Sequence, residues 1–299
     1  MDLEQALKNP TKSPDELRSL HPCLGGAANQ KFGRLHLPVS PVCNIQCRFC
    51  RRSLNKTENR PGVTGSILRP EEAGERVEKA LSLCPDITVV GIAGPGDTLA
   101  TDDAIRAFSY VHKRFPHIIK CVSTTGLLLP EKALALYDAG VRTVTVTVNA
   151  VDPVIQAQII SSVHWKGVTY TGEEAASILI RQQLKGIRII HDLGAVVKVN
   201  SVLIPGVNDG HIGVIAKTVR ENGADLYNII PLIPQHEFKD SPAPNCAQLN
   251  RARDEAEQYI HIFRHCQHCR ADACGIPGQS DLSAQLYANM AVAETFSHG

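Results

Sequence analysis

Short β-branched runs alternate with longer amphipathic segments along most of the chain. Several runs, such as residues 87–93, are apolar at consecutive positions, which is typical of strands buried on both faces of a parallel sheet. The predicted strands are residues 34–39, 87–93, 117–124, 142–149, 195–204 and 225–233. Between them the apolar positions recur with helical period. Helices are therefore expected at residues 70–84, 101–115, 130–139, 172–192 and 209–222, followed by one at 246–265.

This alternation predicts an α/β fold built from six βα units. Six parallel strands joined by right-handed helical crossovers indicate a partial TIM-like (βα)6 barrel, since a closed barrel needs about eight strands. A doubly wound open sheet has the same order of elements and stays open as the alternative. We expect the barrel at residues 34–245. An N-terminal segment (1–33) and a C-terminal helix and tail (246–299) are expected to cover its ends.

Composition and charge restrict the class of protein. Lys and Arg number 31 against 30 for Asp and Glu, so the charge indicates neither a nucleic-acid partner nor a membrane surface. The first residues lack the basic and apolar regions of a secretory signal, and no apolar run is long enough to span a bilayer. We therefore expect a soluble, cytoplasmic protein. In that compartment its 10 cysteines suit metal ligation or core packing better than disulfides.

Residues suited to chemistry follow several of the predicted strands. Active sites of βα barrels form where the strands end, so these residues should converge at one mouth. Three cysteines follow the first strand, and the turn "GPGD", which contains Gly94, Gly96 and Asp97, follows the second. Later strand ends carry residues that can contact a bound ligand, or instead satisfy a neighbouring backbone group. These candidate cofactor-binding residues are Thr147, Asn149, Asn200, Ser201 and Ile204.

The cysteines after the first strand have the spacing Cys-x3-Cys-x2-Cys, with Phe49 before the last one. This pattern resembles the signature of the radical S-adenosylmethionine (SAM) enzymes. The resemblance implies that Cys43, Cys47 and Cys50 hold three irons of a [4Fe–4S] cluster whose open iron binds SAM. An electron from that cluster then cleaves SAM to a 5′-deoxyadenosyl radical. "GPGD" is similar to the glycine-rich turn of the family that receives the SAM amino group, with Asp97 in place of the usual Glu.

Further stretches resemble the NifB family of nitrogenase cofactor maturases. They include "LHPC" (20–23), "NRPGVT" (59–64), "VKVNSVLIPGVND" (197–209) and "HCQHCRADACG" (265–275). The resemblance ends near residue 278, before the position where some members append a cofactor-carrier domain. It implies that the protein fuses two further [4Fe–4S] clusters, which are its substrates. A carbide from the SAM methyl group and one added sulfur would complete an [8Fe–9S–C] precursor of the nitrogenase cofactor.

The same resemblance implies the ligands of the first substrate cluster. Cys23, His36 and Cys121 are distant in sequence, and they match the family positions that bind it. Mixed Cys and His ligation is chemically reasonable, because imidazole is a borderline ligand that changes the potential of a cluster. Without the resemblance, a lone cysteine in a strand is usually a small hydrophobic residue. A lone histidine there is more often a core residue whose hydrogen bonds are satisfied, or a residue that supports a ligand without binding the metal itself.

Cys266 and Cys269 form a Cys-x2-Cys clip that suits the second substrate cluster. A clip of this kind also occurs in zinc knuckles, which His265 or His268 would complete here. Many family members have a further cysteine between the SAM motif and "RPGV", where this chain has Asn55. Cys274 conversely replaces an apolar residue of the family. Either Cys274 compensates as the third ligand of the cluster, or two cysteines hold a labile cluster and Cys274 is a buried bystander.

Glu58 and Arg60 lie close to the SAM motif and are the candidate catalytic residues. A carboxylate there suits proton transfer, and an arginine suits the binding of an anionic cluster or sulfur donor. The alternative is a solvated turn. The resemblance implies SAM, an iron–sulfur cluster donor protein, an electron donor and a downstream assembly or carrier protein as partners. Two competing functions are another radical SAM maturase with auxiliary clusters and a non-catalytic iron–sulfur carrier, which would form no 5′-deoxyadenosine.

Overall fold

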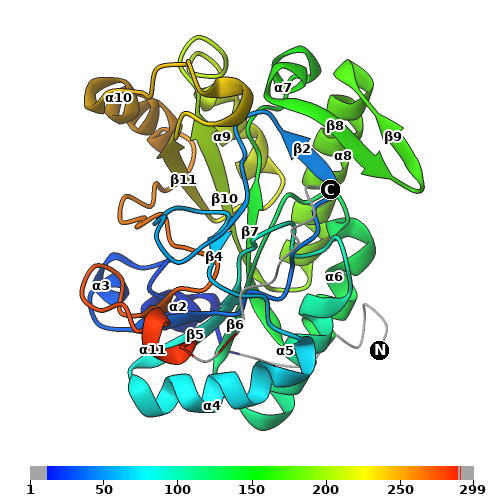
Figure 1. Cartoon of the computed structure of the whole chain (residues 1–299). Coiled ribbons are helices and arrows are strands. Elements are labelled where there is room, and N and C mark those ends of the chain that lie inside the picture. The colour runs from blue at the N-terminus through cyan, green and yellow to red at the C-terminus, as the bar shows by residue number, and fades with distance from the viewer. Residues whose placement is uncertain (1–11, 289, 291–299) are drawn as a thin grey trace.

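The computed structural model describes residues 12–288 and 290, and its centre is a seven-stranded sheet (Figure 1). The strand order is β11-β10-β7-β6-β5-β1-β12, in which all neighbours are parallel except β1 and β12. A doubly wound sheet reverses its strand order at a switch point, and this sheet does not. The predicted α/β partial barrel is therefore confirmed. Its strands are β1 (Gly33–His36), β5 (Ile87–Ile92), β6 (Ile119–Thr124), β7 (Val141–Thr147), β10 (Val196–Leu203), β11 (Leu226–Pro231) and β12 (Cys274–Gly275).

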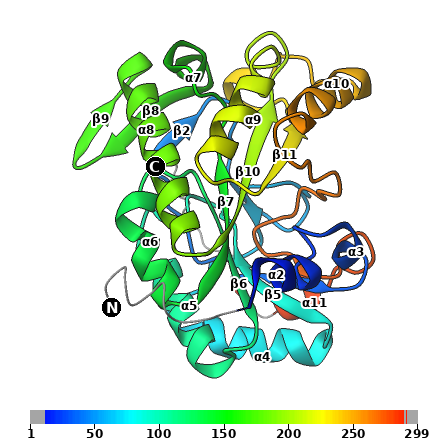
Figure 2. The ribbon, with the colours of Figure 1, turned by 180° about the vertical axis from the view of Figure 1, so that it is seen from behind.

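Helices connect successive parallel strands and pack along the outside of the sheet (Figures 1 and 2). Proline lies at the start of two of them: Pro70 begins a short 3-10 turn before the helix Ala73–Leu83, and Pro130 lies in the first turn of the helix Leu129–Asp138. The helix between the fourth and fifth predicted strands has the expected bounds. The connecting elements are η1 (Pro70–Glu72), α4 (Ala73–Leu83), α5 (Asp103–Arg114), α6 (Leu129–Asp138), α8 (Gly172–Asp192) and α9 (Ile212–Glu221).

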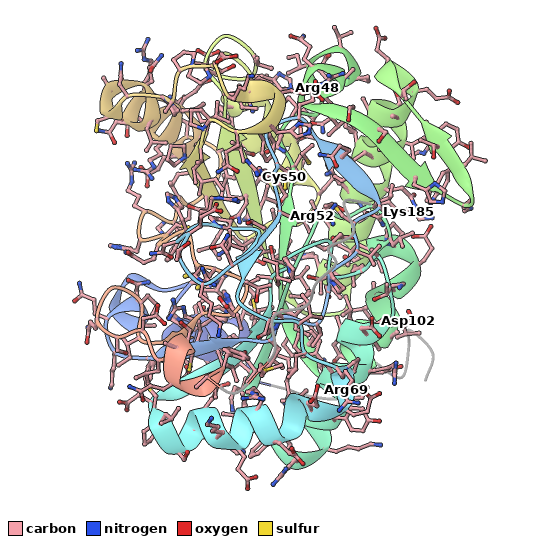
Figure 3. The ribbon with its side chains drawn as sticks, viewed as in Figure 1. Arg48, Cys50, Arg52, Arg69, Asp102 and Lys185 are labelled. Carbon is pink, nitrogen blue, oxygen red and sulfur yellow. The ribbon has the colours of Figure 1, made fainter. Side chains whose placement is uncertain are left out.

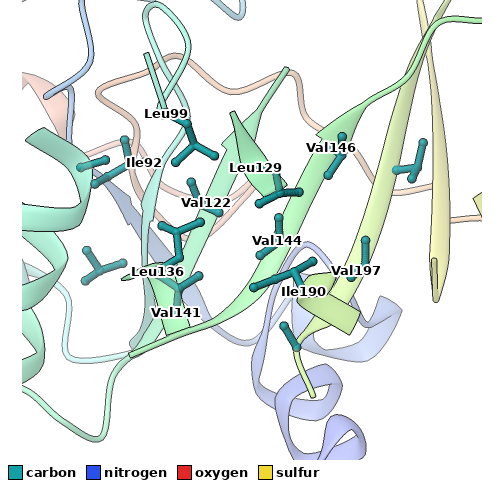
Figure 4. Close-up of a cluster of buried hydrophobic side chains, with 14 of the residues drawn as sticks. Ile92, Leu99, Val122, Leu129, Leu136, Val141, Val144, Val146, Ile190 and Val197 are labelled. Atoms are coloured by element: carbon teal, nitrogen blue, oxygen red, sulfur yellow. The ribbon is translucent and has the colours of Figure 1, made fainter. Parts of the chain in front are cut away.

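The main core lies between the sheet and these helices (Figure 4). Val122, Val144 and Val197 come from three neighbouring strands, and they pack with Leu129 and Ile190 from the helices. All five side chains are buried. Burying each of them contributes about 1.5–3 kcal/mol of hydrophobic free energy. The apolar positions from which the strands and helices were predicted are therefore the positions that form this core.

The N-terminal segment packs against the opposite face of the sheet, where the strands begin. It contains α2 (Pro14–Leu20) and α3 (Gly26–Asn29). Leu17 and Leu24 are buried with Val89, Val196 and Leu226 in a separate apolar cluster. Val89 of β5 lies on this face, while Ile87, Val90 and Ile92 of the same strand pack in the main core, so the strand is apolar on both faces. The segment therefore covers one end of the barrel, as predicted.

The last predicted helix is much shorter than the sequence indicated. α10 (Cys246–Glu257) ends eight residues before the expected end at 265. Beyond it the backbone extends along β11: the Tyr227 N–H donates to the His261 carbonyl (2.9 Å), and the Phe263 N–H donates to the Tyr227 carbonyl (2.8 Å). Burial of Ile260, Ile262 and Phe263 against the sheet outweighs their helical spacing. The Cys-x2-Cys clip consequently lies on a loop and not at the end of a helix.

Several short elements have no counterpart among the predicted ones. A hairpin of β8 and β9 adds to β2 as a three-stranded antiparallel sheet, and two further strands, β3 and β4, pair in parallel. No helix in the described part of the chain is long and apolar enough to cross a membrane. The elements are β2 (Ile45–Cys47), β3 (Ser53–Leu54), β4 (Val63–Thr64), α7 (Pro153–Ile159), β8 (Ile160–Trp165), β9 (Val168–Tyr170), η2 (His236–Phe238) and α11 (Ser283–Leu286).

Candidate functional site

Two cavities adjoin at the ends of the parallel strands. The first cavity is lined by the loop that carries the three clustered cysteines, by the turn at residues 94–97, and by residues after β6 and β7. The second cavity lies beside it and reaches the N-terminal segment and the C-terminal tail. Residues that line both form their common wall: Phe49, Cys50, Ala93, Pro95, Ser123 and Thr147.

Cys43, Cys47 and Cys50 all line the first cavity. Their loop is held on one side by β2, which pairs with β8, and on the other by a hydrogen bond from the Cys50 N–H to the Cys47 carbonyl (3.0 Å). Cys50 lies near the middle of the molecule in Figure 3. Burial raises the pKa of the Cys43 thiol to about 12, and it raises the pKa of the other two thiols as well. Burial therefore favours the protonated thiol. Bound iron would favour the thiolate instead, because a thiol that coordinates a metal is deprotonated.

The turn at residues 94–97 packs closely against the segment that leads into the cysteine loop. The Gly96 N–H donates to the Ser40 carbonyl (2.7 Å), and the Asp97 N–H donates to the Val42 carbonyl (2.9 Å). A Cβ atom on Gly96 would overlap the Val42 carbonyl oxygen. Glycine at position 96 is therefore required by the approach of two backbone segments. Gly94 also lines the first cavity, and its backbone φ is +109°.

Asp97 lines the first cavity and is 2% exposed. Its Oδ1 accepts hydrogen bonds from the Thr124 hydroxyl (2.7 Å) and the Thr125 N–H (2.8 Å). Its Oδ2 is buried and has no hydrogen-bond partner among the residues that the structure describes. Burial raises the pKa of Asp97, and its hydrogen bonds oppose that rise. A buried carboxylate oxygen without a donor is suited to a cationic or N–H donor group of a ligand.

Two glutamines that the sequence analysis missed line the same cavity. The Oε1 atoms of Gln156 and Gln183 are buried without hydrogen-bond partners, so they add two acceptors to that of Asp97. The amide N–H groups of Gln183 donate to the carbonyls of Thr125 (2.9 Å) and Thr147 (2.8 Å), which fixes the direction of its oxygen. For Gln183 the available signal was a glutamine inside the apolar stripe of the helix predicted at residues 172–192, whereas Gln156 lies in a helix (Pro153–Ile159) that was not predicted.

The candidate residues at the later strand ends separate into two groups. Thr147 lines both cavities, Asn149 lines the first and Asn200 lines the second. Ser201 and Ile204 line neither cavity. The Ser201 hydroxyl donates to the Val148 carbonyl and accepts from the Tyr227 hydroxyl, and Ile204 is buried in an apolar cluster. The structure therefore does not place Ser201 and Ile204 where they were predicted to contact a ligand.

The second cavity brings together residues that are widely separated in sequence. Its lining includes five predicted ligands of the substrate clusters: Cys23, His36, Cys121, Cys266 and Cys269. Within residues 12–288 and 290, no three His, Cys, Asp or Glu side chains converge closely enough to hold one metal ion. The ligands of an iron–sulfur cluster bind different irons, so that they are arranged around a volume and need not converge on one point.

His36 presents one ring nitrogen to the second cavity. Its Nδ1 lies 2.9 Å from the Arg270 carbonyl, which only accepts, so we assign the proton to Nδ1. Burial, with a contribution from the Arg34 charge, lowers the pKa of His36 to about 4, and the ring is neutral at neutral pH. Nε2 therefore carries a free lone pair. The ring packs against Gly91, where a Cβ would lie 3.2 Å from Cδ2.

Positive charge dominates the wall of the second cavity. Among the described residues, its lining includes Arg34, Arg51, Arg60 and Lys198 but no aspartate or glutamate. Arg34 donates a hydrogen bond to the Cys269 sulfur (3.1 Å), and the Lys198 Nζ donates to the Cys23 carbonyl (3.2 Å). Two of the cations thus lie directly beside predicted ligand residues. A cavity with this lining is suited to an anionic occupant.

The two candidate catalytic residues differ in their position relative to the second cavity: Arg60 lines it and Glu58 does not. Arg60 lines the second cavity, where it donates to the Arg51 carbonyl (2.6 Å) and forms an ion pair with Glu58 (2.5 Å). The Glu58 side chain is 45% exposed and does not line the cavity. Slight burial acts to raise the pKa of Glu58, but the hydrogen bond and charge of Arg60 lower it below its ordinary value. The predicted anion-binding role suits Arg60, whereas Glu58 holds the arginine from outside the cavity.

Neither Cys274 nor Asn55 reaches the second cavity. Cys274 is fully buried on β12, opposite Leu35 of β1, and it packs in the main core. The Asn55 Oδ1 accepts from the N–H groups of Thr57 (3.0 Å) and Glu58 (2.8 Å), so this side chain stabilises its own loop. The predicted grouping of Cys274 with Cys266 and Cys269 is therefore not found. The position of Cys274 matches the buried bystander of the alternative interpretation.

Comparisons with known proteins agree with this geometry. The family model described as the Radical SAM superfamily matches residues 37–219. The FeMo cofactor biosynthesis protein NifB of Methanocaldococcus infernus is 42% identical over 273 residues, which cover 91% of this chain and 90% of that protein. The protein of the same name from Methanocaldococcus jannaschii is 44% identical over 282 residues, which cover 94% of each.

The fold also has counterparts among solved structures. A radical SAM methyltransferase from Sphaerobacter thermophilus aligns with a TM-score of 0.54. The alignment covers 77% of this chain and 64% of that chain, at 18% sequence identity. A likeness at this identity concerns the fold, and it agrees with the partial barrel described above.

Proposed function

Because the chain belongs to the radical SAM superfamily and to the family of the FeMo cofactor biosynthesis protein NifB, we propose that it builds a precursor of the nitrogenase cofactor. Two [4Fe–4S] clusters are its substrates, and a carbide from the SAM methyl group and one sulfur are added to give an [8Fe–9S–C] product. One observation carries the proposal. The cavity of the three-cysteine loop shares a wall with a cationic cavity lined by Cys23, His36, Cys121, Cys266 and Cys269.

The residues of the first cavity fit a resident [4Fe–4S] cluster and SAM. Cys43, Cys47 and Cys50 offer three thiols from one loop, and soft thiolate ligands favour iron–sulfur clusters. The unpartnered oxygen of Asp97 suits the ammonium group of SAM. When bound, the cluster supplies the electron that cleaves SAM. The free acceptors of Gln156 and Gln183 would receive further N–H or O–H donors of SAM and fix its orientation.

The second cavity suits the two substrate clusters. His36 offers a neutral Nε2, and Cys23 and Cys121 offer sulfur beside it. Arg60 and Lys198 add charge that favours an anionic cluster, and Arg34 does the same near Cys269. Phe49 and Thr147 belong to the wall that both cavities share, so a group leaving SAM would not pass through bulk water before it met the substrate.

Replacing Asp97 by asparagine is expected to weaken SAM binding about 30-fold or more. The amide would keep the size of the side chain but remove the charge that faces the ammonium group, and losing one partner of a buried charge pair costs about 2 kcal/mol or more. Equilibrium dialysis of SAM with anaerobic, iron-loaded protein measures the change. Asp102→Asn is the control, because the Asp102 side chain is 75% exposed. Equal SAM affinity of Asp97→Asn and the unaltered protein would contradict the assigned role.

The proposed function is tested by anaerobic reconstitution with iron and sulfide, followed by addition of dithionite and SAM. About 12 irons per chain are expected, as three [4Fe–4S] clusters require, together with 5′-deoxyadenosine and S-adenosylhomocysteine. About four irons with 5′-deoxyadenosine alone would overturn the proposal and leave a radical SAM enzyme without substrate clusters. Full iron loading without either SAM product would instead identify a cluster carrier.

A further inference from the structure

Neither position from which a third cysteine was predicted supplies one to the cluster site on the tail, and Cys23 and Cys121, which also line the cavity, are assigned to the first substrate cluster. Cys266 and Cys269 line the second cavity, but Cys274 is buried in the core behind β1, and the side chain of Asn55 is engaged in its own loop. A [4Fe–4S] cluster held by two thiolates has two irons without a protein ligand. The three-cysteine loop leaves only one such iron. The residue that fills this position has to come from the lining of the cavity itself.

His268 lies between the two cysteines and lines the cavity with them. Its ring takes part in no hydrogen bond or ion pair within the part of the chain that the structure describes. The backbone there has a φ of +50°, in the left-handed region that a residue with a Cβ adopts at a cost of about 1–2 kcal/mol. Strain of this kind at a residue with an unused ligand atom is typical of a functional site.

The neighbouring histidine has a different environment. His265 packs edge-to-face on Phe263, with ring centroids 5.8 Å apart, and it does not line the cavity. Its Nε2 would lie 3.2 Å from a Cβ placed on Gly26, so its ring faces the N-terminal segment. The two histidines of "HCQHC" are therefore distinguished by the structure: His265 packs on an aromatic ring, and His268 lines the cavity with the two cysteines.

We infer that His268 is the third protein ligand of the substrate cluster bound by Cys266 and Cys269. The inference rests on the proposed function, because it requires a substrate cluster at this site. An imidazole completes the ligand set without a third thiolate, so the site carries one negative charge fewer than a three-cysteine site. Histidine ligation raises the reduction potential of iron–sulfur clusters. Exchange of one thiolate for a neutral ligand also suits a cluster that is consumed and leaves the site.

The test uses the nitrogen of the ligand as its spectroscopic label. Protein carrying His36→Gln, which removes the other predicted histidine ligand, is labelled with 15N-histidine and loaded with iron and sulfide in the absence of SAM. Pulsed electron paramagnetic resonance of the reduced protein is expected to detect coupling to a histidine nitrogen. His268→Gln in this background should abolish the coupling, and His265→Gln, the matched control, should leave it intact. Coupling that is absent from the start, or that survives His268→Gln, would overturn the inference.

A second variant separates a lost ligand from a damaged loop. His268→Cys supplies a thiolate at the same position, so it is expected to retain the iron that His268→Gln loses while still lacking the nitrogen coupling. Failure of His268→Cys to retain this iron would count against the inference. The proposed function fails separately: if Cys266→Ala with Cys269→Ala loses none of the expected four irons per chain, the tail holds no cluster. Loss of those irons without any role for His268 would overturn the inference alone.

Discussion

Replacing Cys266 and Cys269 together by alanine is expected to abolish formation of the eight-iron product while SAM cleavage continues. These cysteines line only the second cavity, whereas the proposed SAM site consists of residues 43–50 and 94–97, which line the first. Removing both thiolates should therefore eliminate the proposed substrate cluster and leave the loop of the resident cluster unchanged. Iron should fall by about four per chain, and dithionite with SAM should still give 5′-deoxyadenosine.

The control for this variant is Cys246→Ala. Cys246 is exposed at the start of α10, and it precedes the clip in the same C-terminal segment. The Cys246→Ala variant should keep the full iron content and should still form the product. Loss of 5′-deoxyadenosine in the double variant would show that the two cavities do not have separate roles. Normal product formation would show that the tail cysteines do not hold a substrate.

The second large effect concerns stability: Arg270→Met is expected to lower the free energy of unfolding by about 3–5 kcal/mol. Arg270 donates to both carboxylate oxygens of Asp272, at 2.8 and 3.0 Å, and also to the carbonyls of Asn55 (2.8 Å) and Glu58. Asp272 in turn accepts from the Gly65 N–H (2.6 Å). Removing the arginine leaves a buried carboxylate without its cation. Denaturation by urea in the metal-free protein measures the loss.

Two comparison variants test the reason for this loss. Arg264 forms an exposed ion pair with Asp254, and Arg264→Met should cost no more than about 1 kcal/mol. Arg270→Met combined with Asp272→Leu should recover part of the stability, since no buried charge then remains unpaired. If Arg270→Met costs as little as Arg264→Met, the buried network does not fix the tail to residues 55–65.

The strands and most helices could be predicted because the apolar positions in their sequences are the positions that are buried in the structure. In β5, Ile87, Val90 and Ile92 pack in the main core, and Val89 packs with the N-terminal segment. The end of α10 could not be predicted in this way. Ile260, Ile262 and Phe263 fit a helix as well as an extended segment, and backbone hydrogen bonds to Tyr227 decide for the extended form. Only the folded sheet supplies those partners.

Part of the site followed from topology. Residues at the ends of neighbouring parallel strands lie close together, so the meeting of Cys50 with Asp97 and Thr147 in one cavity could be expected. The position of Cys274 could not. Cys274 is close to Cys269 in the sequence, which favoured a shared ligand set. Because β12 pairs with β1, however, the Cys274 side chain lies in the core. Side-chain direction in a two-residue strand depends on a partner that the local sequence does not reveal.

The contribution of the SAM methyl carbon tests the central claim most directly. Protein loaded with all three clusters is incubated anaerobically with dithionite and SAM that carries 14C in its methyl group, and the iron–sulfur product is separated from the protein and from small molecules. The account predicts 14C in the iron–sulfur product, together with 5′-deoxyadenosine and S-adenosylhomocysteine. An iron–sulfur fraction without 14C, while SAM is still cleaved to 5′-deoxyadenosine, would contradict it.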